Sequence, residues 1–225
     1  MVVDLQVKSI SASYEAGRNI LQEVTFSLHS GQMMVIHGHN GSGKSTLFRV
    51  LAGLLPLQAG EIHWRGERIQ EVLFGGPIYP WVGLMLQTDN IFPSLTVEEN
   101  IALAMVRGGK KEGGVCKDFL PILKTYWRKR AGLLSGGERK LLGLALAMAI
   151  EVPLLLLDEP IAGLSPSNVE LVQNILTRRK QEGAVIIIVE HSIKSLQENL
   201  IDAKGEMREG VLTIEGHHPN RKNEP

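Results

Sequence analysis

Eight consecutive residues match the pattern G-x-x-x-x-G-K-S, which begins at Gly38 and ends at Ser45. The apolar run Met33–Ile36 before the pattern predicts a buried strand, and the segment after it favours a helix. Glycines let a backbone wrap closely around a polyphosphate, and the N–H groups at a helix start point toward its negative charge. The pattern therefore predicts a phosphate loop that binds a nucleoside triphosphate.

The side chains that end this loop have chemistry of their own. Lys44 can reach the β- and γ-phosphates, and Ser45 can offer its hydroxyl to Mg²⁺. Farther along the chain, the apolar run Leu154–Leu157 is followed directly by Asp158 and Glu159. Ligands of open α/β sheets bind at the carboxyl ends of strands, so we expect Asp158 to hold Mg²⁺ and Glu159 to polarise the attacking water. The alternative is that the two acids only cap the next element.

A third segment, Leu134–Glu138, precedes a predicted helix that extends to about residue 150. Ser135 has the chemistry of an N-cap, which leaves N–H groups and the positive end of the helix dipole at the surface. Such an end can bind a γ-phosphate, and it can equally be an ordinary helix cap. The residues alone leave both interpretations open.

Composition limits the possible functions. Lys and Arg total 24, as do Asp and Glu, so no overall charge favours nucleic acid or acidic lipid. The basic run Arg128–Arg130 is typical of a solvated helix face, and we expect no nucleic-acid partner. Cys116 is the only cysteine, which excludes an intrachain disulfide and agrees with a cytoplasmic protein. The most apolar stretch, Leu141–Ile150, is too short to span a bilayer, so we expect membrane contact only through partner proteins.

The order of patterns predicts an α/β fold. Short alternations in residues 2–36 predict an antiparallel β layer, and residues 96–134 read as an inserted helical subdomain with a flexible glycine-rich connection at 108–114. From Gly136 onward, helices (136–150, 167–182 and 193–198) alternate with apolar strands (154–157 and 185–189), which implies a mostly parallel sheet covered by helices. We expect one domain over residues 1–216 and a disordered tail over 217–225.

Five features in this order resemble the ATP-binding cassette (ABC) family of ATPases: an aromatic at Tyr14, the phosphate loop, Gln87, the segment Leu134–Glu138, and the acidic strand followed by His191. The likeness extends from about residue 5 to 216. It implies a P-loop NTPase core, with ATP and Mg²⁺ as cofactors. It also implies that two such domains pair head to tail, so that each ATP lies between one chain's phosphate loop and the other chain's Leu134–Glu138 segment.

The resemblance assigns roles to single residues. Tyr14 would stack on adenine, although it can also be an ordinary strand aromatic. Gln87 would sense Mg²⁺ and the γ-phosphate, and His191 would contact the γ-phosphate and hold the attacking water. The catalytic residues implied are Lys44, Glu159 and His191, and the metal ligands implied are Ser45, Gln87 and Asp158. The nucleotide-binding residues implied are Tyr14, Gly38, His39, Asn40, Gly41, Ser42, Gly43, Lys44, Ser45, Thr46 and Gln87, together with Ser135, Gly136 and Gly137 toward the partner's nucleotide.

Three positions depart from the common family pattern. His39 stands where proline is frequent, Glu138 where glutamine is usual, and Ser165 where aspartate is common. None of the three removes a catalytic group. A small residue at 165 resembles the branched-chain amino-acid importer branch, as do the segments Val189–His191, Leu134–Glu138 and Phe92–Asn100.

The function implied is the ATP-binding and ATP-hydrolysing subunit of a membrane ABC transporter, which drives transport by closing and opening a dimer. Its partners would be integral-membrane subunits, docked near residues 87–99 and the helical insertion, and a second ABC ATPase chain, identical or related. We expect the chain at the cytoplasmic face of the membrane. The alternative is a soluble ABC ATPase in iron–sulfur assembly or in nucleic-acid or ribosome transactions, but a second cassette, a long coiled-coil insertion and a marked basic face are absent from the sequence. A regulator without hydrolysis is disfavoured by the intact Lys44, Asp158, Glu159 and His191.

Overall fold

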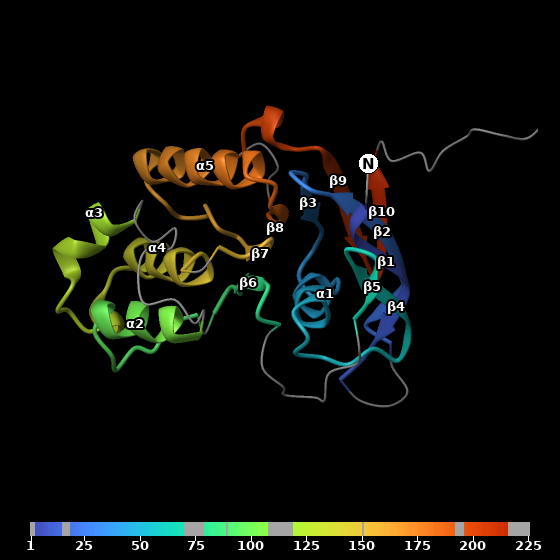
Figure 1. Ribbon diagram of the computed structural model, residues 1–225, viewed down its shortest axis with the longest axis horizontal. Coiled ribbons are helices and arrows are strands. Elements are labelled where there is room, and N and C mark those ends of the chain that lie inside the picture. Colours follow the sequence, from blue (N-terminus) through green and yellow to red (C-terminus); the bar gives the residue numbers. More distant parts are fainter. Residues whose placement is uncertain are drawn as a thin grey trace, which may run out of the picture.

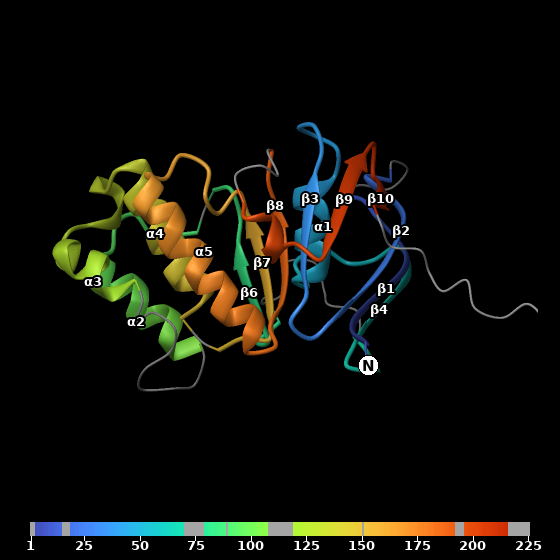
Figure 2. The same cartoon turned by 90° about the horizontal axis from the view of Figure 1, so that it is seen from above.

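The computed structural model describes residues 3–14, 19–69, 79–88, 90–107, 119–149, 151–191 and 196–215. Its strands form two sheets, one of four strands in the order β2-β1-β4-β5 and one of six in the order β10-β9-β3-β8-β7-β6. The views in Figures 1 and 2 place the four-stranded sheet at one side of the molecule and most of the helices at the other, with most of the six-stranded sheet between them and its edge strand β10 beside β2.

The four-stranded sheet is antiparallel throughout. Its strands are β1 (Val3–Ala12), β2 (Leu21–His29), β4 (Ala59–Trp64) and β5 (Glu67–Arg68). In β2 the buried Val24, Phe26 and Leu28 alternate with more exposed residues, because successive side chains of a strand point to opposite faces. The predicted antiparallel layer is therefore confirmed.

The six-stranded sheet is mostly parallel, as the sequence predicted. Its strands are β3 (Met33–His37), β6 (Val82–Met85), β7 (Leu154–Asp158), β8 (Val185–Val189), β9 (Ala203–Arg208) and β10 (Val211–Glu215). Only β10 runs antiparallel to its neighbour. All residues of β7 and β8 are buried, because both faces of this part of the sheet are covered.

Five α-helices accompany the sheets within the described residues. They are α1 (Lys44–Leu51), α2 (Val97–Arg107), α3 (Leu120–Leu123), α4 (Gly136–Ala147) and α5 (Pro166–Gln181). Short 3₁₀ turns lie at Lys124–Tyr126, Ala131–Leu133 and Glu198–Leu200. Within this part of the chain, no helix combines the length and apolar character that crossing a membrane requires.

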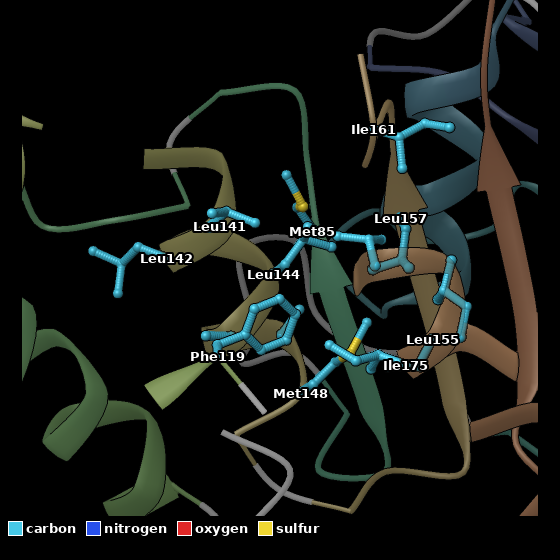
Figure 3. Packing of buried hydrophobic residues seen from close by; sticks show 14 of the residues in the cluster. Met85, Phe119, Leu141, Leu142, Leu144, Met148, Leu155, Leu157, Ile161 and Ile175 are labelled. Atoms are coloured by element: carbon cyan, nitrogen blue, oxygen red, sulfur yellow. The ribbon is translucent and has the colours of Figure 1, made fainter. Parts of the chain in front are cut away.

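Two buried clusters hold these elements together. One joins α2, α3, α4 and α5 to one face of the six-stranded sheet. Figure 3 shows part of it, with Leu141 and Leu144 of α4 and Met148, the C-cap residue of α4, packed on the side of the sheet that carries Leu155 and Leu157 of β7. The other joins α1 and the opposite face of the sheet to the antiparallel layer. The phosphate loop between β3 and α1 is thus anchored in both cores.

The structure differs from the sequence expectation at several places. The helix expected to reach residue 150 ends at Ala147, and 150 itself lies outside the described residues. The basic run 128–130 lies in a turn and a bridge rather than on a helix face. Within the expected helix 193–198, residues 193–195 lie outside the described residues, and a 3₁₀ turn starts at Glu198. Strands β9 and β10 were not predicted. The expected flexible connection 108–114, Cys116 and the tail 217–225 also lie outside the described residues.

Candidate functional site

The phosphate loop joins the buried strand β3 to α1 through backbone conformations that favour glycine. Gly43 is the N-cap of α1 and has φ 110°, a left-handed value that other residues rarely adopt. A Cβ on Gly38 would lie 2.2 Å from the carbonyl oxygen of Met207 in β9, so only glycine fits there. No side chain of the described residues caps α1, which leaves the N–H groups at its start directed into the loop.

Lys44 lies across this loop. Its Nζ donates hydrogen bonds to the carbonyl oxygens of Gly38 at 2.8 Å and His39 at 2.7 Å, and the residue is only 8% exposed. Burial lowers the pKa of Lys44, while the charges of Asp158 and Glu159 act in the opposite direction. The ammonium group is therefore held inside the loop by main-chain oxygens.

Asp158, the last residue of β7, lies beside the start of α1. The hydroxyl of Ser45 donates a hydrogen bond to its Oδ2 at 3.1 Å. Burial raises the pKa of Asp158, and the Ser45 hydrogen bond partly offsets that rise. The structure thus brings together two of the oxygen-bearing side chains that the sequence predicted as metal ligands.

Glu159 connects the ends of three neighbouring strands. Its Oε1 lies 2.8 Å from Nε2 of His191, which follows β8, and accepts a hydrogen bond at 3.3 Å from Nε2 of Gln87, which follows β6. Its N–H donates to the carbonyl oxygen of Val189 at 2.8 Å. Gln87 and His191, which the family resemblance singled out, therefore both meet the Glu159 carboxylate.

Two cavities adjoin the loop. The first, of about 460 Å³, is lined by Ile20, Asn40, Gly41, Gly43, Lys44, Ser45, Thr46, Gln87, Asp158 and Glu159. The second, of about 730 Å³, is lined by Tyr14, Asn19, Ile20, Gln22, His39, Gly41, Glu209 and Gly210. Ile20 and Gly41 line both, so the two cavities meet across the phosphate loop.

Tyr14 lies on the wall of the larger cavity, where its side chain is accessible. The residue is 41% exposed, and its hydroxyl accepts a hydrogen bond at 2.7 Å from Arg49 of α1. The lining also includes Gln22 and the β9–β10 turn, which the sequence analysis missed. Gly210 of that turn donates its N–H to the carbonyl oxygen of Ser42 at 2.9 Å, which ties the turn to the phosphate loop.

The start of α4 lies elsewhere on the chain. Ser135 is its N-cap: the Ser135 hydroxyl accepts from the N–H of Glu138 at 3.3 Å, and the Ser135 N–H donates to Glu138 Oε2 at 2.7 Å. That second hydrogen bond lowers the pKa of Glu138. Ser135, Gly136 and Gly137 line neither cavity, so the described chain does not bring them to its own phosphate loop.

The phosphate loop, the acidic strand end and the α4 cap all lie within one stretch of chain that a known family covers. The sequence model for the family described as ABC transporter matches residues 21–162, more than half of the chain. This chain belongs to the ABC transporter family. The resemblance inferred from the motifs is therefore confirmed.

Several proteins similar to this chain are ATP-binding subunits by name. The chain is 33% identical over 195 residues to the probable branched-chain amino acid transport ATP-binding protein LivF of Archaeoglobus fulgidus, with 84% of this chain and 82% of LivF covered. It is 30% identical to the high-affinity branched-chain amino acid transport ATP-binding protein BraG of Pseudomonas aeruginosa, with 80% and 79% covered. A solved ATP-binding subunit of an ABC transporter superposes with a TM-score of 0.82 at 26% identity, with 94% and 89% covered.

These findings confirm the P-loop NTPase fold and make this ABC chain a nucleotide-binding ATPase. The roles of single residues and the domain limits stay predictions. Sequence reasoning also missed two charged residues near Glu159. Lys140 donates a hydrogen bond to its carbonyl oxygen, and Glu190 accepts one from the N–H of Ile161.

Proposed function

We propose that this ABC ATPase hydrolyses ATP to drive a membrane importer for amino acids of the branched-chain type. The observation that carries the catalytic part is the Glu159 carboxylate, held by Gln87 and His191 beside the phosphate loop. The substrate class rests on the names of the two relatives above. Those names also favour a transporter over the soluble alternative.

ATP is the substrate, and the two cavities suit its two ends. The smaller one has Lys44 and the N–H groups at the start of α1, which match a triphosphate. The larger one has the accessible ring of Tyr14, which offers a stacking surface to adenine. Gly41 lines both cavities, so one nucleotide would lie along the loop.

The residues beside the smaller cavity fit Mg²⁺. Ser45 and Asp158 provide a hydroxyl and a carboxylate, the hard oxygen donors that Mg²⁺ prefers, and Gln87 adds an amide from the same cavity. Burial raises the pKa of Asp158, and a cation bound there would lower it again by stabilising the ionised carboxylate. Bound Mg²⁺ would neutralise charge on the phosphate oxygens.

In hydrolysis, we assign separate roles to three side chains of this chain. Lys44 stabilises negative charge on the transferring phosphate. Glu159 has one carboxylate oxygen occupied by Gln87 and His191, so its other oxygen is the one we assign to orienting the attacking water. His191 has a side chain 52% exposed, which lets it face the γ-phosphate while it fixes Glu159.

We assign the start of α4 to a second chain's nucleotide. Ser135 and Gly136 are exposed, and a Cβ on Gly136 would meet no atom of the described chain within 4 Å. A helix of this length with small residues at its start suits an anion. Two copies paired head to tail would complete each site with the partner's Ser135, Gly136 and Gly137.

The helical region carries an accessible apolar surface that suits membrane subunits. Phe92, Leu103, Val106 and Leu133 are 59%, 47%, 77% and 68% exposed, and all belong to residues 92–133. Exposed apolar side chains on one region often mark a protein interface. We propose that integral-membrane subunits dock here and that the chain lies at the cytoplasmic face of the membrane.

The catalytic part is tested with Glu159→Gln. Because the amide keeps the shape but cannot act as a carboxylate toward water, turnover should fall by about 100-fold or more while ATP binding persists. The Glu159→Gln chain should then form an ATP-stabilised dimer in size-exclusion chromatography with light scattering. Glu67→Gln, at an exposed position in β5, is the matched control and should behave as wild type. Hydrolysis retained by Glu159→Gln would exclude the assigned role.

The partner part is tested by purifying the native protein from gently solubilised membranes and identifying its companions by mass spectrometry. Multi-span proteins recovered in fixed stoichiometry would support the docking proposal. Recovery only from the soluble fraction, with assembly factors or ribosomes, would contradict it.

A further inference from the structure

The turn that carries Glu159 begins with an unfavourable backbone conformation. Glu159 has φ 50°, a left-handed value that is uncommon for a residue with a side chain. Such a conformation persists only where the surroundings hold it. The contacts that hold this turn therefore also set the direction of the Glu159 carboxylate.

Lys140 of α4 supplies two of these contacts. Its Nζ donates to the carbonyl oxygen of Glu159 at 2.8 Å and to that of Ala162 at 2.5 Å. One ammonium group thus fixes both ends of a four-residue stretch. Lys140 is half-buried, so water competes with these bonds less than it would at the surface.

Other contacts join the same turn to α4 and to β8. Ile161 belongs to the buried cluster that also contains Leu141 and Leu144 of α4 (Figure 3). A Cβ on Gly137 would lie 3.7 Å from Leu164, so the first turn of α4 also lies against the end of this segment. On the other side, the 97% buried Glu190 accepts a hydrogen bond from the N–H of Ile161 at 3.3 Å.

The charges around Lys140 agree with this geometry. Burial lowers the pKa of Lys140, while the carboxylates of Glu190, Glu159 and Asp158 raise it. Burial also raises the pKa of Glu190, and the Ile161 hydrogen bond and Lys140 counter that rise. Lys140 thus places a positive charge among three acids.

We propose that Lys140 is a positioning residue, which orients Glu159 for hydrolysis and links it to the partner-facing start of α4. This inference rests on the proposed roles of Glu159 and Ser135. Lys140 lies between one and two helical turns from Ser135 on the same helix. A movement of α4 against the partner's nucleotide therefore moves the carbonyl of Glu159, and each chain's catalytic turn responds to the nucleotide that its own α4 contacts.

The test compares full-length variants for ATP hydrolysis and for ATP affinity. Lys140→Met keeps the aliphatic stem and removes the donor, and we expect kcat to fall about tenfold or more with the Kd for ATP nearly unchanged. Lys140→Arg retains a cationic donor and should restore part of the rate. Lys180→Met is the matched control, because the half-buried Lys180 also donates to a carbonyl oxygen, that of Leu200, but pairs with Asp202 instead of contacting the Glu159 turn.

A second readout separates positioning from assembly. Glu159→Gln combined with Lys140→Met should still form the ATP-stabilised dimer, since only the catalytic geometry is altered. Unchanged kcat in Lys140→Met, parallel loss of kcat and ATP affinity, or failure of the double variant to dimerise would each overturn the inference. If the wild-type chain does not hydrolyse ATP, or if the Glu159→Gln chain with native Lys140 does not form the ATP-stabilised dimer, the proposed function is overturned, and this inference with it.

Discussion

The two helix starts of the candidate site, those of α1 and α4, are built in opposite ways. At α1 the N-cap is Gly43, no side chain of the described residues occupies the N–H groups, and Lys44 and Asp158 surround them within the same chain. At α4 the cap is Ser135, which exchanges hydrogen bonds with Glu138 in a closed capping box. The next residue, Gly136, faces open space, because a Cβ there would meet no described atom within 4 Å.

This contrast separates what one chain can do from what it needs a second chain to do. The α1 start has its own walls, since Gln87, Glu159 and the loop glycines line the same cavity. The α4 start has satisfied two N–H groups through its capping box and presents small residues outward. A single chain is therefore organised to bind a nucleotide, whereas the proposed hydrolytic site is complete only in a dimer.

The largest expected effect tests this division by complementation. Lys44→Ala should lower ATP hydrolysis by about 100-fold or more, because the loop loses its cation for the phosphates. Ser135→Arg should also abolish hydrolysis, because the long side chain blocks the partner's nucleotide. A mixture of the two variants should regain roughly a quarter of wild-type activity, since half of randomly formed dimers are mixed and each contains one intact site.

The control mixture pairs Lys44→Ala with a chain that carries both substitutions. No dimer in that mixture contains an intact site, so steady-state hydrolysis should stay at the level of Lys44→Ala alone. Equal activity in the two mixtures would show that Ser135 does not act across a dimer or that a dimer with one intact site does not hydrolyse ATP.

A smaller effect is expected at Tyr14, which belongs to the part of the nucleotide site that a single chain provides. Tyr14→Ala removes the stacking ring, and ATP affinity should fall about tenfold, within the range for an aromatic on a base. Tyr14→Phe keeps the ring and loses only the hydroxyl that accepts from Arg49, so its affinity should stay close to wild type. Displacement of a fluorescent nucleotide by ATP measures the affinity of both variants, at protein concentrations too low for dimers to form. A loss that appears only when dimers form would contradict the single-chain assignment.

The sequence could predict the α1 side because its signals are local. Gly38–Ser45 follows an apolar strand, and Asp158 and Glu159 follow another, so spacing alone places them at one edge of a parallel sheet. The antiparallel layer and the parallel order of the core strands also follow from short apolar patterns. What carried Tyr14, Gln87 and His191 was the family resemblance, because an isolated aromatic, amide or imidazole has no specific spacing.

The missed parts depend on contacts between distant segments. Strand β9 alternates buried Ala203, Gly205 and Met207 with polar residues, but a glycine within so short a run weakens the strand signal. The strand finds its place by pairing in parallel with β3, far away in the sequence, and this pairing brings the β9–β10 turn to the larger cavity. Lys140 was missed for a similar reason: a lysine in a helix is ordinary until the fold brings it to the carbonyl of Glu159.

The smallest expected effect concerns stability, and it has opposite signs at the two helix starts. Burial, reinforced by the charge of Glu159, raises the pKa of Asp158 above the value that the unfolded chain would have. The native state therefore binds more protons than the unfolded state in that range, so stability falls as pH rises through the native pKa. At neutral pH the ionised Asp158 destabilises the nucleotide-free chain, although it is the residue we assign to Mg²⁺.

Asp158→Asn should consequently raise Tm at pH 7 by a few degrees, which corresponds to about 1 kcal/mol in a chain of this size. The gain should shrink as pH is lowered toward and below about 4, the ordinary pKa range of an Asp carboxyl, because Asp158 becomes protonated in both the native and the unfolded state. Ser135→Ala should do the reverse and lose about 1 kcal/mol at any of these pH values, since it removes a cap that stabilises α4. Thermal unfolding without nucleotide or Mg²⁺ measures the change in Tm of each variant and shows whether the two changes have opposite signs. Destabilisation by Asp158→Asn at pH 7 would mean that Ser45 and Lys44 already compensate the negative charge of Asp158. The residues around the start of α1 would then stabilise the chain without a ligand, as the cap of α4 does.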